Sequence, residues 1–232
     1  MAKVIGVDGC NGGWIAAARE RGVIRARRIA RLEELFLESP APEVVAVDIP
    51  IGLPESGARA CDAEARHLLG PKRGSSVFPA PPRALLAAKT YEEAGRLRER
   101  LEGKRISKQT WLIVPKIAEV DAFLRRSSAA RAATHEVHPE VSFYYLNGER
   151  PVLEPKRKPA GQAERLELLR GWCGSAIDGA LAYRGRLGCG ADDVLDAFAA
   201  LWTAERIAAE KAVTHPENPE LDAHGLAMSI SA

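Results

Sequence analysis

Four short apolar runs separated by turn residues open the chain, and their β-branched composition predicts strands. They cover residues 3–7, 14–19, 23–29 and 44–47. The dipeptide Arg21-Gly22 between the second and third runs predicts a β-hairpin. A segment with helical spacing at 32–37 precedes the fourth run. This order predicts three antiparallel strands, then a helix, then a strand that returns to the middle of the sheet as in a βαβ unit.

Helical patterns dominate the rest of the chain. They cover residues 58–69, 91–101, 107–126, 162–170 and 191–209. Pro115 is expected to kink or end the third of these helices. We interpret residues 56–133 as a helical insertion into an α/β domain. Strand texture returns at 136–141, and the residues after His215 are expected to be loosely held, apart from a short closing strand at 226–230.

Composition bounds the class of protein rather than its chemistry. The 232 residues are 46% hydrophobic and 28% charged, which suits one globular domain with a sizeable core. The N-terminus lacks a secretory pattern, and no run approaches the roughly 20 apolar residues of a membrane span. We therefore expect a cytoplasmic protein with no membrane partner and four reduced cysteines. The oligomeric state stays open, a homodimer included.

The net charge of +2 conceals an uneven distribution of charge along the chain. Residues 56–133 hold sixteen Lys and Arg against eight Asp and Glu, whereas the rest holds seventeen against twenty-three. A basic segment beside an acidic core fits a carboxylate site next to a surface that steers phosphates. Nucleic acid, DNA or RNA, is then the candidate partner. The alternative is a set of solvated helix faces, which charge runs commonly form.

Two of the predicted strands end in a carboxylate, Asp8 and Asp48. The carboxyl ends of strands in an open α/β sheet face the crevice where ligands bind, so these side chains are expected to lie close together. Two adjacent carboxylates repel each other, and a divalent cation turns that cost into a favourable interaction. The alternative is that each aspartate caps the turn after its strand.

The late helical pattern contains a second pair of carboxylates, Asp193 and Asp196. Residues three apart share a helix face, so the two can point the same way. Capping of the helix N-terminus is the alternative for Asp193. Capping does not explain Asp196 well. The apolar run at 197–202 indicates that this helix is buried, and an unpaired carboxylate on a buried helix is costly.

The segment Glu136-Val137-His138-Pro139-Glu140 supplies further candidates for metal ligation or general acid–base chemistry. In a strand, Glu136, His138 and Glu140 would project to one face. The surrounding HEVH lacks the spacing of the zinc-protease motif, and a structural role for His138 is the alternative.

Three residues in the basic segment are candidates for substrate binding. Arg83, Lys116 and Gln109 could contact phosphate or carboxylate groups, with an ordinary surface position as the alternative for each.

The ordered motifs of this chain resemble the domain of unknown function 429 family, a prokaryotic family often labelled predicted RNase H-like nuclease. The resemblance extends from Val4 to about Arg206. Six segments carry it: GVDGCNGGW (6–14), VDIPIGLPE (47–55), SSVFPAPPRALL (75–86), KQTWLIVPKIAEVD (108–121), EVHPEVSF (136–143) and DDVLDAFAALWTA (192–204).

The resemblance implies an RNase H-like fold, a mixed five-stranded sheet whose first three strands are antiparallel. RNase H-like nucleases place acids on the first strand, the fourth strand and the last helix, and Asp8, Asp48 and the Asp193/Asp196 pair fall in those slots. The fourth-strand acid is often Glu in the RuvC-type resolvases, so Asp48 is a departure. The basic insertion is another, and it prevents transfer of the resolvases' substrate to this chain.

The activity implied is that of a metal-dependent nuclease or phosphodiesterase using two Mg²⁺ or Mn²⁺ ions. Asp8 would bridge both ions, Asp48 and Asp193 or Asp196 would each complete one, and Glu136 or His138 would assist with protons or metal. One alternative is a phosphotransferase of the actin-like type with a phosphate turn at 9–13, although such proteins normally require two domains. Another is a non-catalytic protein that binds metal, nucleic acid or a metabolite.

Overall fold

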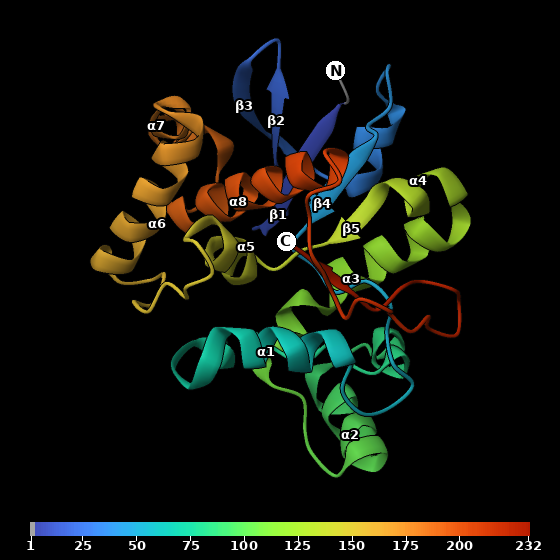
Figure 1. Ribbon diagram of the computed structural model, residues 1–232. Helices are drawn as coiled ribbons and strands as arrows, with labels where there is room; N and C mark the ends of the chain where they lie inside the picture. Colours follow the sequence, from blue (N-terminus) through green and yellow to red (C-terminus); the bar gives the residue numbers. More distant parts are fainter. Residues whose placement is uncertain (1–2) are drawn as a thin grey trace.

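The apolar runs pair into one mixed five-stranded sheet in the computed structural model, which describes residues 3–232 (Figure 1). The strands are β1 (Val4–Cys10), β2 (Gly13–Glu20), β3 (Val23–Ile29), β4 (Val44–Val47) and β5 (Thr134–Glu136). Their order is β3-β2-β1-β4-β5. The first three are antiparallel neighbours, whereas β4 is parallel to β1 and β5 is parallel to β4. The predicted α/β class and the antiparallel start of the sheet are confirmed.

The described part of the chain also contains eight α-helices. They are α1 (Ala60–Arg73), α2 (Tyr91–Glu102), α3 (Lys108–Arg126), α4 (Ser128–Ala133), α5 (Pro139–Leu146), α6 (Pro159–Cys173), α7 (Ala176–Leu187) and α8 (Ala191–Ala208). Short 3₁₀ turns η1 (Leu32–Leu37), η2 (Gly74–Ser76) and η3 (Arg83–Ala87), and a small strand pair β6 (Thr214–His215) and β7 (Ile230–Ser231), complete the fold. Within residues 3–232, no helix is both long and apolar enough to cross a membrane.

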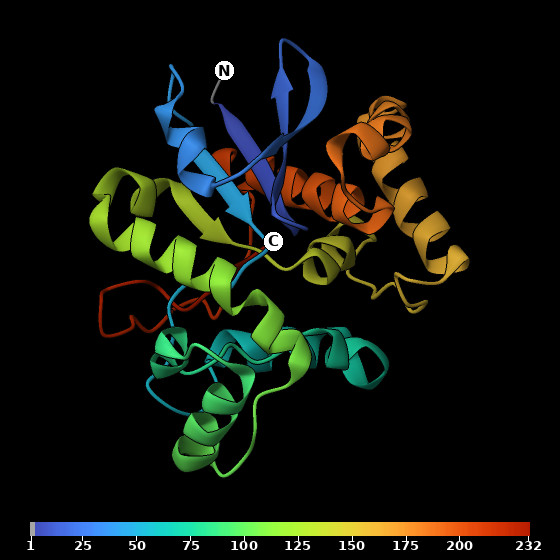
Figure 2. The same cartoon turned by 180° about the vertical axis from the view of Figure 1, so that it is seen from behind.

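The helix α8 lies across one face of the sheet, and α3 with α4 covers the other (Figures 1 and 2). Alternation along β1 explains how one strand serves both faces: Val4 packs in the core under α8, whereas Ile5 and Val7 pack in the core under α3. Gly6 lets α8 approach closely, since a Cβ there would lie 2.0 Å from the Leu201 nitrogen. The last helix is therefore held directly against the central strand.

The basic segment 56–133 is divided between two environments. Helices α1 and α2 lie beyond the end of the sheet toward which β1 and β4 run (Figure 1). The second half of α3 instead belongs to the central core, where Ile117 and Val120 are buried with Val7. Its continuation into α4 leads directly to β5. Part of the predicted insertion therefore forms the helical layer that packs on one face of the sheet.

Three local expectations were wrong in whole or in part. The strand ends at Glu136 rather than continuing to 141, because Pro139 fixes the first turn of α5. Of the two outcomes expected at Pro115, an end of the helix is wrong: α3 continues through Pro115, which removes one N–H donor without ending the helix. The residues after His215 are held in place: Leu226 and Ile230 are buried, and β7 pairs with β6.

Candidate metal centre

The strand-end carboxylates Asp8 and Asp48 both project toward α8. Asp8 shares the face of Val4 and Gly6 on β1, and Asp48 follows Val44 and Ala46 of β4 in the same alternation. The Asp48 backbone N–H donates to the Val7 carbonyl at 2.9 Å, which keeps the two strands in register at this end. The expected convergence of the two aspartates is thus produced by the pleat of the sheet.

Burial dominates the electrostatics of Asp8. Its side chain is buried, and burial raises its pKa well above the usual range, with the charges of Asp48 and Asp196 adding to the rise. Lys156 opposes the shift. These carboxylates are therefore close enough to repel one another, which is the condition under which a cation stabilises such a cluster.

Asp196 is the most deeply buried of these acids, at 1% exposure. Its Oδ2 accepts a hydrogen bond from the Lys156 ammonium, whereas its Oδ1 is buried without a partner. Burial raises the pKa of Asp196 to about 6, against the opposing effect of Lys156. An unpartnered carboxylate oxygen in the interior is costly, and a bound cation would remove that cost.

Asp193 lies on the same helix but has a different partner. Its Oδ2 accepts from the Gly190 backbone N–H at 2.8 Å, so it caps the N-terminus of α8. Burial raises its pKa while this hydrogen bond opposes the rise. Asp193 also acts on the pKa of Asp8 less than Asp48 or Asp196 does. Of the predicted pair, Asp196 is the member that the fold brings into the cluster.

Lys156, which the sequence analysis did not single out, supplies the positive charge at this cluster. Its pKa is raised, first by Asp196 and also by Asp8 and Asp48. The side chain comes from the loop between α5 and α6 and retains 39% exposure. No helical or strand periodicity marks a loop lysine, so only the three-dimensional structure shows its position.

The donor set fits a hard divalent cation in charge and chemistry. Carboxylate oxygens are the ligands that Mg²⁺ and Mn²⁺ prefer, and Asp196 Oδ1 is a buried acceptor without a donor. Within residues 3–232, however, no three His, Cys, Asp or Glu side chains are already placed as a metal-binding group. The arrangement is a carboxylate cluster neutralised in part by Lys156, rather than a preassembled cage.

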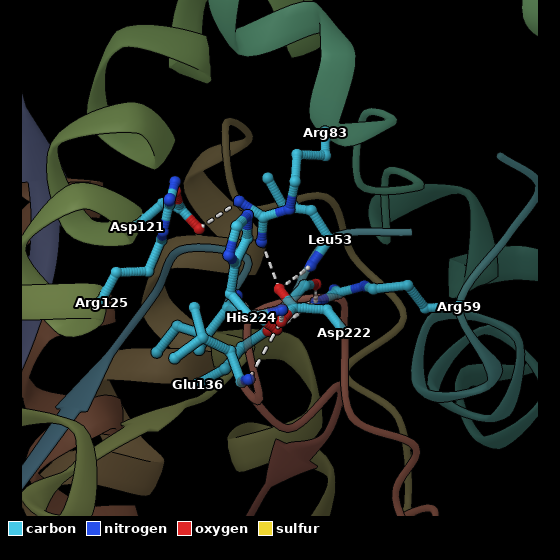
Figure 3. Close-up of polar contacts among 11 residues, drawn as sticks. Leu53, Arg59, Arg83, Asp121, Arg125, Glu136, Asp222 and His224 are labelled. Atoms are coloured by element: carbon cyan, nitrogen blue, oxygen red, sulfur yellow. Dashed lines mark hydrogen bonds and ion pairs between the residues drawn. The ribbon is translucent and has the colours of Figure 1, made fainter. Parts of the chain in front are cut away.

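Glu136 is occupied by an ion pair at the end of β5. Its two oxygens accept from the Arg59 guanidinium at 2.7 Å each, and Oε2 also accepts from the Ile51 N–H at 2.6 Å (Figure 3). Arg59 pairs in addition with Asp62 at 2.6 Å. Burial raises the pKa of Glu136 to about 7, and Arg59 opposes that rise. Glu136 therefore fastens the loop after β4 to β5 and α1.

His138 and Glu140 lie at the start of α5. The Nδ1 atom of His138 is buried without a partner. Glu140 is held by Arg165 at 2.7 Å and by Arg73 at 3.1 Å. Burial alone would raise the pKa of Glu140, but Arg165 and then Arg73 outweigh burial and lower it. Glu140 is thus a charged structural partner, whereas His138 retains an unused ring nitrogen.

One cleft of about 490 Å³ joins most of the predicted site residues. Its lining includes Asp8, Asp48, Gln109, Lys116, Glu136 and His138. Lys156 and Arg157 line it as well. Asp193, Asp196 and Arg83 are not among the lining residues. Arg83 forms ion pairs with Asp121 and Asp222, and it holds the C-terminal segment against α3 (Figure 3). Its position indicates a structural clamp.

Lys116 lies beside Asp8 at the end of β1. Its ammonium is 4.3 Å from the centroid of the Trp14 ring and donates to the Gly13 carbonyl. Gly9 leaves room for the lysine, since a Cβ there would lie 3.1 Å from its Cδ. Burial lowers the pKa of Lys116. Lys116 therefore places a cation next to the acidic cluster and holds it there by a cation–π contact with Trp14.

Fold and site together define an α/β protein in which carboxylates at the carboxyl ends of two parallel strands meet a buried carboxylate from the helix α8. The sequence matches the family described as "Protein of unknown function (DUF429)" over residues 6–221, and the chain belongs to that family. No curated protein and no solved structure matches the chain.

Proposed function

We propose that this protein is a divalent-metal-dependent phosphodiesterase with an RNase H-like fold, acting on nucleic acid. The sheet order and the positions of Asp8, Asp48 and Asp196 support the fold assignment, because they match the slots expected for such nucleases. The observation that carries the proposal is a cluster of mutually repelling carboxylates in which Asp8 and Asp196 are buried and Asp48 is half-buried, with Asp196 Oδ1 left without a donor.

Asp8, Asp48 and Asp196 would hold Mg²⁺ or Mn²⁺, with Asp193 reserved for capping α8. When bound, such ions lower the pKa of a coordinated water and neutralise charge on phosphate oxygens. The hard oxygen donors favour these ions over zinc.

The chain's own cations would position the phosphate. Lys116 beside Asp8 and Lys156 beside Asp196 line the same cleft, so a phosphodiester placed at the acids would lie near both ammonium groups. Both lysines would oppose the negative charge that grows on the phosphate during attack by water. His138 lines the cleft, so its imidazole is the group that we expect to accept or donate a proton there.

The test is cleavage of a labelled panel of single strands, duplexes, RNA–DNA hybrids, junctions and dinucleotides in Mg²⁺ or Mn²⁺. We expect at least one substrate to be cut, and cutting to stop with EDTA and in Asp8→Asn. Asp178→Asn serves as the matched control, because Asp178 of α7 has a side chain that is 41% exposed and lies outside the cleft lining. Cleavage that survives Asp8→Asn would refute the mechanism, and binding without cleavage would favour a non-catalytic role.

A further inference from the structure

The cleft is lined by apolar side chains as well as by the carboxylates Asp8 and Asp48. Phe78 is 44% exposed and lines the cleft with Val77 and Ile113. Most large apolar side chains of this protein are buried, whereas Phe78 is uncovered among the charged residues that line this cleft. A flat apolar ring at a phosphate-binding cleft is the usual platform for stacking an unpaired base.

A second feature of the cleft lining is an unbalanced positive charge at the end of α1. Arg73 shares the single carboxylate of Glu140 with Arg165, which is fully buried and holds both Glu140 oxygens at 2.7 Å. Two guanidinium groups against one carboxylate leave a net positive charge. The Nε atom of Arg73 is also buried without a partner, and Arg73 lines the cleft. A phosphate oxygen in the cleft would pair with the accessible part of the Arg73 guanidinium, whose side chain is 11% exposed.

The size of the cleft restricts what can enter it. A volume of about 490 Å³ lies in the range of small-ligand pockets, roughly 300–1,000 Å³. Specific duplex recognition instead covers about 1,000–2,500 Å² of protein surface. The cleft lining includes Val77 and Phe78, Ile113 of α3, and Pro155 to Arg157. Neighbouring bases cover both faces of a base inside a duplex, so a base must leave the duplex stack before it can stack on Phe78.

We infer that the cleft binds a short single-stranded segment of nucleic acid, with an unpaired base on Phe78 and a backbone phosphate at Arg73. This inference rests on the proposed function, because it takes the acidic cluster as the place of the scissile phosphate. It excludes intact duplex as the preferred ligand. DNA and RNA share the base and phosphate chemistry used here, and the experiment separates them.

The experiment measures binding without cleavage. Fluorescence anisotropy with Asp8→Asn protein in Mg²⁺ compares labelled single-stranded DNA, single-stranded RNA and the matching duplexes. We expect one of the single strands to bind at least about tenfold more tightly than its duplex. Phe78→Ala should weaken that binding about 5- to 150-fold, the range for loss of one stacked base, and Phe78→Tyr should restore it. Arg73→Gln should weaken binding and reduce its salt dependence by about one phosphate contact.

Matched controls are available at exposed positions outside the cleft lining. Leu112 of α3 is 74% exposed, and Leu112→Ala should bind as the parent does. Arg100 of α2 is exposed, and Arg100→Gln controls for loss of a charge. Each variant must retain the parent melting temperature. Equal or tighter binding of duplex, no binding of any strand, or no effect of Phe78→Ala would overturn the inference.

The two proposals can fail separately. Single-strand binding that depends on Phe78, without cleavage by the wild-type protein, would support this inference and refute the nuclease. Metal-dependent cleavage of duplexes that is insensitive to Phe78→Ala would support the nuclease and refute this inference.

Discussion

At the scale of single residues, the acidic cluster is an arrangement that costs stability in the metal-free protein. Burial and the charges of Asp48 and Asp196 raise the pKa of Asp8 well above its usual range. Residues that serve a ligand rather than the fold commonly show this pattern, because the ligand later compensates the repulsion. The cluster is therefore better explained by binding than by folding.

Asp8→Asn should stabilise the metal-free protein by about 1 kcal/mol while abolishing activity, because it removes one of the repelling charges. Urea unfolding in EDTA measures the free energy of unfolding. Asp62→Asn is the matched control: Asp62 is buried but paired with Arg59 at 2.6 Å, so its substitution should cost about 2 kcal/mol. Destabilisation by both substitutions would mean that Asp8 is a structural residue.

Lys156→Met should have the opposite effect on the metal-free protein. Loss of the ammonium leaves Asp196 without its cation, and we expect a loss of about 1–2 kcal/mol, below the cost for a fully buried pair because Lys156 is 39% exposed. Added Mg²⁺ should recover more stability in this variant than in the wild type. Lys158→Met, from an exposed pair two residues away, should change neither quantity. Equal behaviour of the two variants would contradict the role assigned to Lys156.

At the scale of elements, the site depends on how closely α8 lies against β1. Gly6→Ala would place a Cβ 2.0 Å from the Leu201 nitrogen and 2.4 Å from the Ala197 carbonyl, so α8 must move and carry Asp196 with it. We expect a loss of about 3 kcal/mol or more. Gly171→Ala in α6 meets open space and should stabilise slightly. Thermal unfolding of both variants checks this, and a tolerated Gly6→Ala would refute the tight packing.

Elements with a strong local pattern were predictable from sequence. The strands β1 to β4 and the helix α8 follow from apolar periodicity, and Asp8, Asp48 and Asp196 follow from their places on them. Arg59 and Lys156 were missed because ion pairs between distant segments leave no periodic signal. The same limit applies to Glu136, whose strand position was predicted but whose pairing with Arg59 was not.

At the scale of the whole molecule, buried ion pairs tie the helices around the cleft to the sheet. Glu140 of α5 joins Arg73 of α1 to Arg165 of α6, and Asp222 joins the C-terminal segment to Arg83. These contacts link parts of the chain that are far apart in sequence. The cleft is consequently a product of the complete fold, since its lining extends from Asp8 to Ile230.

This arrangement predicts how stability depends on pH. Arg165 and Arg73 lower the pKa of Glu140 below its ordinary value of 4.5, so its contribution is fully present above that pH. It is lost as the pH falls through the lower, folded-state pKa. Glu140→Gln should therefore reduce stability at pH 7 and flatten the decline between about pH 5 and pH 2. Urea unfolding across that range measures the effect, and parallel curves for the two proteins would contradict it.

The most direct test of the carboxylate cluster is its response to metal. Binding to the folded state alone stabilises a protein by about 2.7 kcal/mol at a hundred times the Kd, or roughly 5–10 °C for a chain of this length. We predict that millimolar Mg²⁺ or Mn²⁺ raises the melting temperature of the wild-type protein by several degrees relative to EDTA. The same ions should leave Asp8→Asn and Asp196→Asn almost unchanged. No rise in the wild type, or an equal rise in all three proteins, would contradict the metal centre proposed for Asp8, Asp48 and Asp196.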